Sequence, residues 1–208
     1  MSLDKADLLL AGAEAKFKEL APKVAQDQQL ALQFWAKLIA NSKAVVSLVQ
    51  TDYGSPAAMV HRVSIEHFAY MYGLVNGVIT VESVEQQLKY DILKNAKGLD
   101  SAQRRDDKAG RDVLTEENRQ HLAEFLDDDG NKVKDPGVRV YNILGELDLD
   151  FIYNIYRLYS VNAAHANMFS CRWNPNEAEV TVLLDNVNDL LEIAGALWQE
   201  KVGSGELA

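Results

Sequence analysis

Apolar residues recur every three to four positions along most of this chain, and this spacing limits what the chain can fold into. In its last third the residues at this spacing are Leu183, Val187, Leu190 and Leu191. Such a pattern places apolar side chains on one face of an α-helix, which must then be buried against other helices. The run that most resembles a strand, 78–81, is too short to build a sheet. We therefore predict an all-α fold.

Turn and capping residues predict where the helices begin and end. We expect helices over about 3–20, 22–50, 55–75, 81–97, 115–126, 140–147, 150–169 and 174–198. Three devices are typical of first helical turns: Pro22, the Ser-Pro pair at Ser55 and the Asn-Pro pair at Asn174. Gly77 and Gly98 are typical of helix ends, where glycine adopts a left-handed backbone without strain.

One segment departs from this pattern. Residues 99–136 carry few apolar side chains and many charges, among them the run Arg-Arg-Asp-Asp-Lys at 104–108. Because such a composition buries little surface, the first part of the segment, 100–112, is either an exposed helix or a mobile linker. We predict that the whole chain, 1–208, is a single helical domain: a helical bundle with this polar insertion between two halves of the core.

Composition excludes several classes of function. The 208 residues include 21 Lys+Arg and 31 Asp+Glu, a formal net charge of −10, so the protein repels nucleic-acid backbones and anionic lipids. RNA could bind only through a local cleft. No run approaches the ~18 apolar residues that span a bilayer, and no signal peptide is visible. We expect a cytoplasmic protein without membrane contact. Cys171 is the only cysteine, which excludes an intrachain disulfide.

Arg62 and Glu66 are the first candidates for a functional site. They are four residues apart on an expected helix and therefore share a face, on which Met59 and Val63 also lie. One interpretation is a polar pair that faces a cleft. The other is an ordinary intrahelical ion pair, which contributes only a few tenths of a kcal/mol.

A second candidate region is 156–167, where Arg157, Ser160, Asn162 and His165 lie among small alanines that allow close helix packing. A histidine that titrates near neutrality can act as a general acid or base, and an arginine can hold a phosphate. The alternative is a core histidine with satisfied hydrogen bonds and an arginine that extends to solvent.

Metal and cofactor motifs are absent from the sequence. His61 and His67 are six residues apart, which places them on different sides of a helix. His121 and Glu117 share a helical face, but no third ligand is apparent. Because glycine-rich phosphate loops are also missing, we expect neither a metal nor a cofactor.

The residues that carry a family resemblance are Arg62-x-x-x-Glu66, Lys89 and Tyr159-Ser160-x-x-x-x-His165. This combination resembles an uncharacterised bacterial all-α family, similar in outline to the HEPN and abortive-infection helical bundles. The similarity covers about half of the chain, 56–97 and 150–200. Many members of that group are dimeric RNA-cleaving toxins or defence proteins, so the resemblance implies a helical bundle that cleaves RNA.

The resemblance also implies roles for individual residues. His165 would orient or deprotonate a ribose 2′-hydroxyl, while an arginine, Arg157 or Arg62, would hold the phosphate, with Glu66 as the partner of Arg62. The expected binding residues are Lys89, Ser160 and Asn162. Arg157 and His165 stand eight positions apart, which on a helix leaves their side chains about 80° apart.

Two other functions remain open at this stage. The acidic surface is also typical of a non-enzymatic module that binds a protein partner, and a helical bundle can hold a small molecule between its helices. We expect a protein partner or a homo-oligomer, most simply a dimer. Convergence of Arg62, Glu66 and His165 on one cavity would favour an enzyme or a ligand-binding bundle. Their dispersal over the surface would favour the interaction module.

Overall fold

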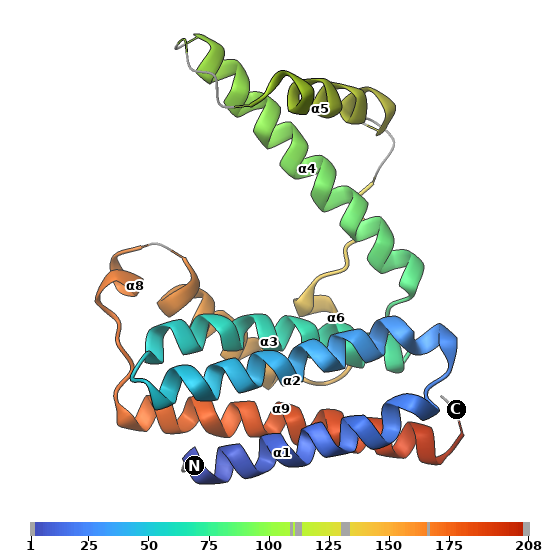
Figure 1. The fold of residues 1–208 in the computed structure, drawn as a ribbon, viewed down its shortest axis with the longest axis vertical. Coiled ribbons are helices and arrows are strands. Elements are labelled where there is room, and N and C mark those ends of the chain that lie inside the picture. Colours follow the sequence, from blue (N-terminus) through green and yellow to red (C-terminus); the bar gives the residue numbers. More distant parts are fainter. Residues whose placement is uncertain (1–2, 109, 111–113, 130–133, 166, 206–208) are drawn as a thin grey trace. The chain divides into compact units, whose positions relative to one another are not determined.

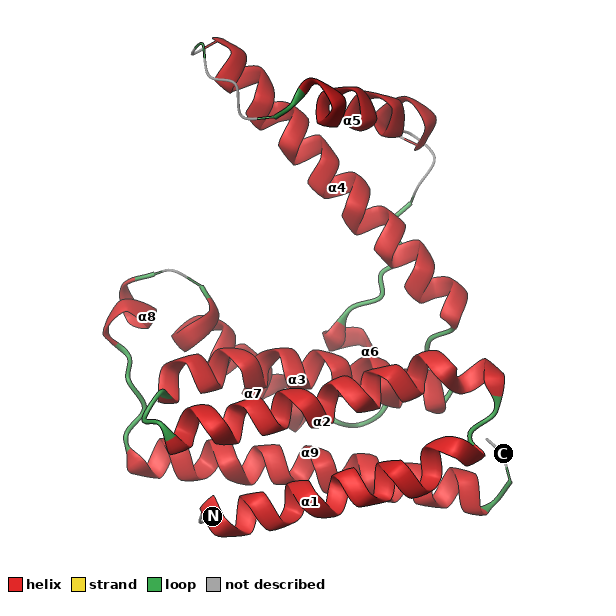
Figure 2. Cartoon of the chain, viewed as in Figure 1, coloured by secondary structure: helices red, strands yellow, loops and turns green. Residues whose placement is uncertain are grey.

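A computed structural model confirms the all-α fold. It describes residues 3–108, 110, 114–129, 134–165 and 167–205. Within these ranges every regular element is a helix and none is a strand (Figure 2). No helix of the described ranges combines the length and the apolar character needed to cross a membrane.

The chain separates into two compact units, Met1–Ile79 with Arg139–Ala208, and Thr80–Val138. Unit 1 contains α1 (Leu3–Leu20), η1 (Ala21–Lys23), η2 (Gln26–Gln28), α2 (Gln29–Gln50), α3 (Gly54–Val75), α6 (Val140–Glu146), α7 (Asp150–Tyr159), η3 (Ser160–Ala164), α8 (Met168–Arg172) and α9 (Glu177–Gly203). Unit 2 contains α4 (Val81–Lys108) and α5 (Glu116–Asp129). The boundaries of unit 2 enclose the predicted polar insertion and extend beyond it on both sides.

In unit 1 the long helices α1, α2, α3 and α9 run side by side (Figure 1). Helix α1 packs on α2 and α9, and α2 packs on α3 and α9. Helix α3 also contacts α6, α7 and η3. It is therefore the central element of unit 1, and its side chains meet both the long helices and the shorter segments that follow unit 2 in the sequence.

Aromatic side chains hold the long helices together. Trp35 of α2 and Trp198 of α9 are fully buried, and their rings stack with centroids 5.3 Å apart. Phe17 of α1 meets Trp35 edge-on at 5.0 Å. The indole Nε1 of Trp198 donates a hydrogen bond to the Met71 sulfur of α3 at 3.3 Å. Each such ring pair contributes about 0.5–1.5 kcal/mol beyond its burial, so this cluster joins all four helices.

Two helix starts differ from the predictions because other residues make the caps. Helix α9 is capped by Asn176 rather than Asn174: the Asn176 side chain accepts a hydrogen bond from the Glu179 N–H, and the Glu179 carboxylate accepts one from the Asn176 N–H. This reciprocal pair is a capping box. Pro22 does not open α2, because it lies in the short 3₁₀ turn η1, and α2 begins only at Gln29.

Helix α3 begins at Gly54, one residue before the predicted Ser55 cap, and Tyr53 at its N-cap makes no side-chain hydrogen bond. A Cβ atom on Gly54 would lie 2.5 Å from Cγ of Pro175, so the close approach of this helix start to the segment before α9 requires glycine. The other end of α3 is as predicted, because Gly77 follows it with a φ of 70°.

Unit 2 is built from α4 and α5, which contact each other. We predicted that the first of these helices would end at Gly98, but α4 continues to Lys108. A glycine inside an exposed helix costs about 1 kcal/mol relative to alanine and need not end it. Asp107 accepts hydrogen bonds from Gln103 at 2.7 Å and from Arg119 of α5 at 3.2 Å. The start of the 99–136 segment is thus a helix. Helix α5 was expected over 115–126 and continues to Asp129.

Candidate functional site

Arg62 and Glu66 of α3 form the ion pair that the sequence predicts. Arg62 Nη2 lies 3.2 Å from Glu66 Oε1, and the two side chains are 20% and 32% exposed. The pair is therefore screened less by water than an ordinary surface ion pair, which contributes 0–1 kcal/mol. Because both side chains stand on the face of α3 that meets the segment from α6 to η3, their position depends on what that segment supplies.

Tyr156 and Ser160 supply the remaining partners. Arg62 donates from Nε to the Ser160 hydroxyl at 2.8 Å and from Nη2 to the Tyr156 hydroxyl at 2.6 Å. The Tyr156 hydroxyl in turn donates to Glu66 at 3.0 Å. We call Arg62, Glu66, Tyr156 and Ser160 the polar cluster. It fixes α7 on α3 through charged hydrogen bonds, which contribute more than neutral ones.

The electrostatics of the polar cluster keep Tyr156 protonated. Burial raises the pKa of its phenol above the ordinary value of 10.0, and the negative charge of Glu66 raises this pKa further, against a smaller lowering by Arg62. The Arg62 guanidinium also lies 4.6 Å from the centre of the Tyr156 ring, within the range of a cation–π contact. Tyr156 is thus a stable hydrogen-bond donor and is unsuited to act as a base.

A π turn follows α7 and corrects the helix predicted over 150–169. The α-helix ends at Tyr159, and η3 (Ser160–Ala164) is a single π turn. The Ser160 hydroxyl donates to the Tyr156 carbonyl at 2.7 Å while it accepts from Arg62. His165 has extended backbone, with φ −106° and ψ 131°. The 80° separation expected between Arg157 and His165 on one helix therefore does not apply.

The structure brings together Arg62, Glu66 and Ser160, three of the residues singled out from the sequence. Arg62 and Glu66 pair with each other, as expected. Arg62 also contacts Ser160, whereas His165, which was expected on the same helix as Ser160, lies after the π turn and is not part of the polar cluster. Tyr156, which joins all three, was not singled out. Its spacing of four from Ser160 was the available signal, because a tyrosine and a serine on one helical face can both reach the same neighbouring arginine.

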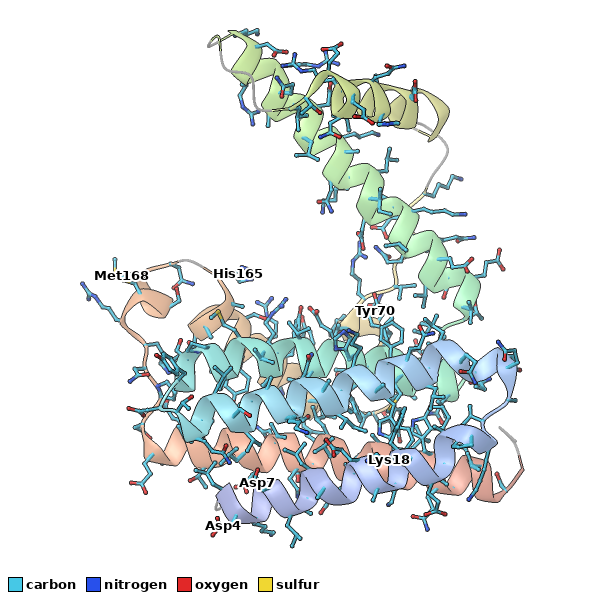
Figure 3. All side chains as sticks on the ribbon, viewed as in Figure 1. Asp4, Asp7, Lys18, Tyr70, His165 and Met168 are labelled. Atoms are coloured by element: carbon cyan, nitrogen blue, oxygen red, sulfur yellow. The ribbon has the colours of Figure 1, made fainter. Side chains whose placement is uncertain are left out.

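The other predicted site residues are not members of the polar cluster. Arg157 and His165 are exposed, and neither side chain forms a hydrogen bond or ion pair with any residue in the described part of the chain. Asn162 is half-buried in the π turn. Figure 3 shows His165 in the segment between α7 and α8, near Met168. Lys89 is exposed on α4 and belongs to unit 2.

The side of α7 opposite the polar cluster is partly exposed and partly packed, because Phe151 and Ile155 also line a small cavity with His61 of α3. Phe151 and Leu158 are 51% and 53% exposed, and Ile155 between them is half-buried. Their spacing of four and three places the three side chains in one apolar stripe. Asp150 lies exposed at the start of the helix and Arg157 near its end. We call Phe151, Ile155 and Leu158 the α7 stripe.

His61 is a buried residue whose importance the sequence did not indicate. Its side chain is fully buried, and neither ring nitrogen has a hydrogen-bond partner among the described residues. Its ring meets Tyr159 edge-on at 5.6 Å. Burial lowers the pKa of His61 to about 3. An adjacent cavity of about 10 Å³, also lined by Asn186 and Asp189, has room for about one water molecule. His61 is thus a neutral core residue that does not act as a base near neutral pH.

No group of three or more His, Cys, Asp and Glu side chains in the described residues is arranged to hold a metal ion. The chain matches the model of a family of unknown function, DUF5677, over residues 28–177. This range runs from the start of α2 to the start of α9 and includes the polar cluster, the α7 stripe and His165. No curated protein and no solved structure matches the chain. Because the match covers more than half of its residues, the chain belongs to the family of unknown function DUF5677.

Proposed function

We propose that this protein is an interaction module that pairs with a second copy of itself through the α7 stripe. The observation that carries the proposal is the exposure of Phe151 and Leu158, about half of each side chain, on one face of a helix whose opposite face is anchored by the polar cluster. Apolar side chains of this size are costly to leave in water at ~25 cal/mol per Å², so a contiguous exposed stripe favours a partner.

The charges beside the stripe favour a second copy as that partner. Across a twofold axis two α7 helices would run antiparallel, with Phe151 of one copy against Leu158 of the other. The same arrangement brings Arg157 near Asp150 of the second copy, and this pair occurs twice because a twofold interface is self-complementary. Both residues are exposed, and neither side chain forms an ion pair or hydrogen bond within the described residues of its own copy. Opposite charges around an apolar contact fix its register.

The polar cluster makes this surface rigid. Arg62 holds the hydroxyls of Tyr156 and Ser160, which lie one helical turn apart on the inner side of α7. These contacts fix the rotation of α7 about its own axis and so keep the stripe outward. A surface that is already ordered loses less conformational entropy on binding. The role that this proposal gives to Arg62 is therefore structural positioning, while the stripe makes the contact.

The experiment that tests the proposal is sedimentation velocity over a range of protein concentrations. The stripe is short, so we expect a reversible dimer with a dissociation constant of about 1–100 µM. Leu158→Asp should leave a monomer at every concentration, because the carboxylate would be buried in the contact. Val182→Asp on α9 is the matched control, since Val182 is also 53% exposed, and it should dimerise like the wild type. A monomeric wild-type protein, or a dimeric Leu158→Asp variant, would overturn the proposal.

A HEPN-like, defence-associated ribonuclease is the second candidate function. The observation in its favour is the exposure of Arg157 and His165 on the two sides of the π turn, where both side chains are accessible to a substrate. In this function His165 would deprotonate the ribose 2′-hydroxyl and Arg157 would hold the phosphate. Cleavage of a fluorescent single-stranded RNA tests it. Activity that His165→Ala abolishes, and that His121→Ala preserves, would support it. Absence of cleavage by the wild-type protein would refute it.

A further inference from the structure

A groove between α1 and α9 has the features of a small-molecule site. Its volume is about 220 Å³. The residues that line it are Leu8, Leu9, Gly12, Ala13 and Lys16 of α1, and Asn188, Leu191, Glu192 and Gly195 of α9. On each helix these positions recur at spacings of three and four, so each helix contributes one continuous face. The groove lies in unit 1, away from the residues of the polar cluster and the α7 stripe.

The groove contains a buried polar atom without a partner. Asn188 Oδ1 is shielded from solvent and accepts no hydrogen bond from any described residue. A buried acceptor left unsatisfied costs about 1–3 kcal/mol, so natural proteins usually give such an atom a partner. Because Asn188 lines the groove, a rotation of its side chain would present this oxygen to a bound molecule with an N–H or O–H group.

Two opposite charges also line the groove. Lys16 of α1 and Glu192 of α9 form no ion pair or hydrogen bond with other described residues. Glu192 stands four residues after Asn188, so its carboxylate and the unpartnered amide oxygen lie on the same face of α9. The groove thus offers a positive group from one helix, and a negative group with an acceptor from the other.

Two glycines keep the groove open. A Cβ atom on Gly195 would lie 3.1 Å from Cδ and 3.3 Å from Nζ of Lys16, so glycine lets the lysine side chain lie close against α9. A Cβ atom on Gly12 would meet no other atom within 4 Å, so the space above Gly12 is empty. Leu8, which is 73% exposed, borders this space together with Leu9 and Leu191.

We propose that the groove binds a free hydrophobic amino acid such as leucine. Its carboxylate pairs with the Lys16 ammonium group, and its ammonium group pairs with Glu192 and donates to Asn188 Oδ1. Its side chain occupies the apolar part of the groove beside Leu8 and Leu191. The three kinds of group present in the groove, a cation, an anion with an acceptor, and an apolar wall, match the three parts of such a molecule. A purely anionic or purely apolar ligand would leave part of the lining without a partner.

Isothermal titration calorimetry with the full chain tests the proposal. L-leucine, L-isoleucine or L-phenylalanine should bind, while glycine, which has no side chain, should bind at least tenfold more weakly. Leucinamide, which lacks the carboxylate, and N-acetyl-leucine, which lacks the ammonium group, should also lose at least tenfold. Lys16→Met should weaken leucine binding at least tenfold yet leave the affinity for leucinamide unchanged, because that ligand has no carboxylate to lose. Lys18→Met, an exposed change on the same helix, is the control and should bind leucine normally.

A plug variant separates loss of the site from loss of the fold. Gly12→Leu should fill the empty space and abolish binding, with an unchanged helical circular-dichroism spectrum, whereas Ala11→Leu, one position outside the lining, should bind like the wild type. Failure of all three amino acids to bind would overturn the proposal. Equal affinity for leucine and leucinamide would also overturn it. A leucyl tripeptide that binds as tightly as leucine would do the same, because the ligand would then be the end of a peptide. Sedimentation velocity tests dimerisation through the α7 stripe, whereas calorimetry tests the groove, so either proposal can fail without the other.

Discussion

Buried His61 should make the stability of this protein depend on pH in a defined way. Its pKa is about 3 in the folded protein and 6.5 in an unfolded chain. Below pH 6.5 the unfolded chain therefore binds a proton that the folded protein does not bind. Stability is then highest above pH 6.5 and falls progressively as the pH drops from 6.5 towards 3. Between pH 7.5 and pH 5.0 this one residue should lower the free energy of unfolding by ~2 kcal/mol.

His61→Phe isolates this contribution. The substitution keeps a ring in the core but removes the titrating group and the two nitrogens without partners. At pH 7.5 we expect the variant to be as stable as the wild type or more stable, since each unpartnered nitrogen costs about 1–3 kcal/mol. Urea denaturation followed by circular dichroism at pH 5.0 and pH 7.5 gives the loss of stability for each protein. The loss should be ~2 kcal/mol smaller in the variant.

Other titrating groups are present in both proteins and cancel in this comparison. Burial also lowers the pKa of His67, and burial raises the pKa of Asp189. The matched control is His121→Phe, because His121 is exposed on α5 and its replacement leaves His61 in place, so the loss of stability that His61 causes should remain. An identical pH dependence in the wild type and the His61→Phe variant would refute the reasoning, because His61 would then be accessible to protons in the folded protein.

Two further substitutions test the packing and the capping. Asn176→Ala should lower the free energy of unfolding by ~1 kcal/mol because the capping box is lost, whereas Asn174→Ala should change it little. Gly73→Ala should lower the free energy of unfolding by about 1–3 kcal/mol, since the added Cβ would lie 2.8 Å from a side-chain carbon of Ile143. Gly98→Ala, in the exposed part of α4, should be neutral or stabilising. Urea denaturation measures all four variants. Equal effects of the two asparagine substitutions would contradict the assigned cap of α9, and equal effects of the two glycine substitutions would contradict the close packing at Gly73.

The sequence predicts the fold class because helical periodicity is a local property. The stripe from Leu183 to Leu191 is explained by the burial of one face of α9, and the pairing of Arg62 with Glu66 follows from their spacing on α3. Helix boundaries were less predictable where two candidate caps stood close together. Asn174 and Asn176 both suit a helix start, and the choice depends on Glu179, which reaches only the second.

The rest of the site depends on contacts between distant segments. Tyr156 joins the polar cluster because α7 packs on α3 with the Tyr156 hydroxyl towards Arg62. The sequence of α7 alone does not define this rotation of the helix about its axis. The π turn after Tyr159 has no sequence signal comparable to a proline or a glycine, yet it places His165 outside the helix. The buried state of His61 likewise depends on Tyr159, almost a hundred positions away.

The central claim is that two copies pair through the α7 stripe in an antiparallel register, and a charge swap measured by sedimentation velocity tests it most directly. Arg157→Asp and Asp150→Arg should each weaken the dimer about tenfold, since two symmetry-related surface pairs contribute ~0.7 kcal/mol each. In the double variant, in which the two charges are exchanged, the wild-type dissociation constant should return. Equal dissociation constants for all four proteins, or additive weakening in the double variant, would contradict the antiparallel contact.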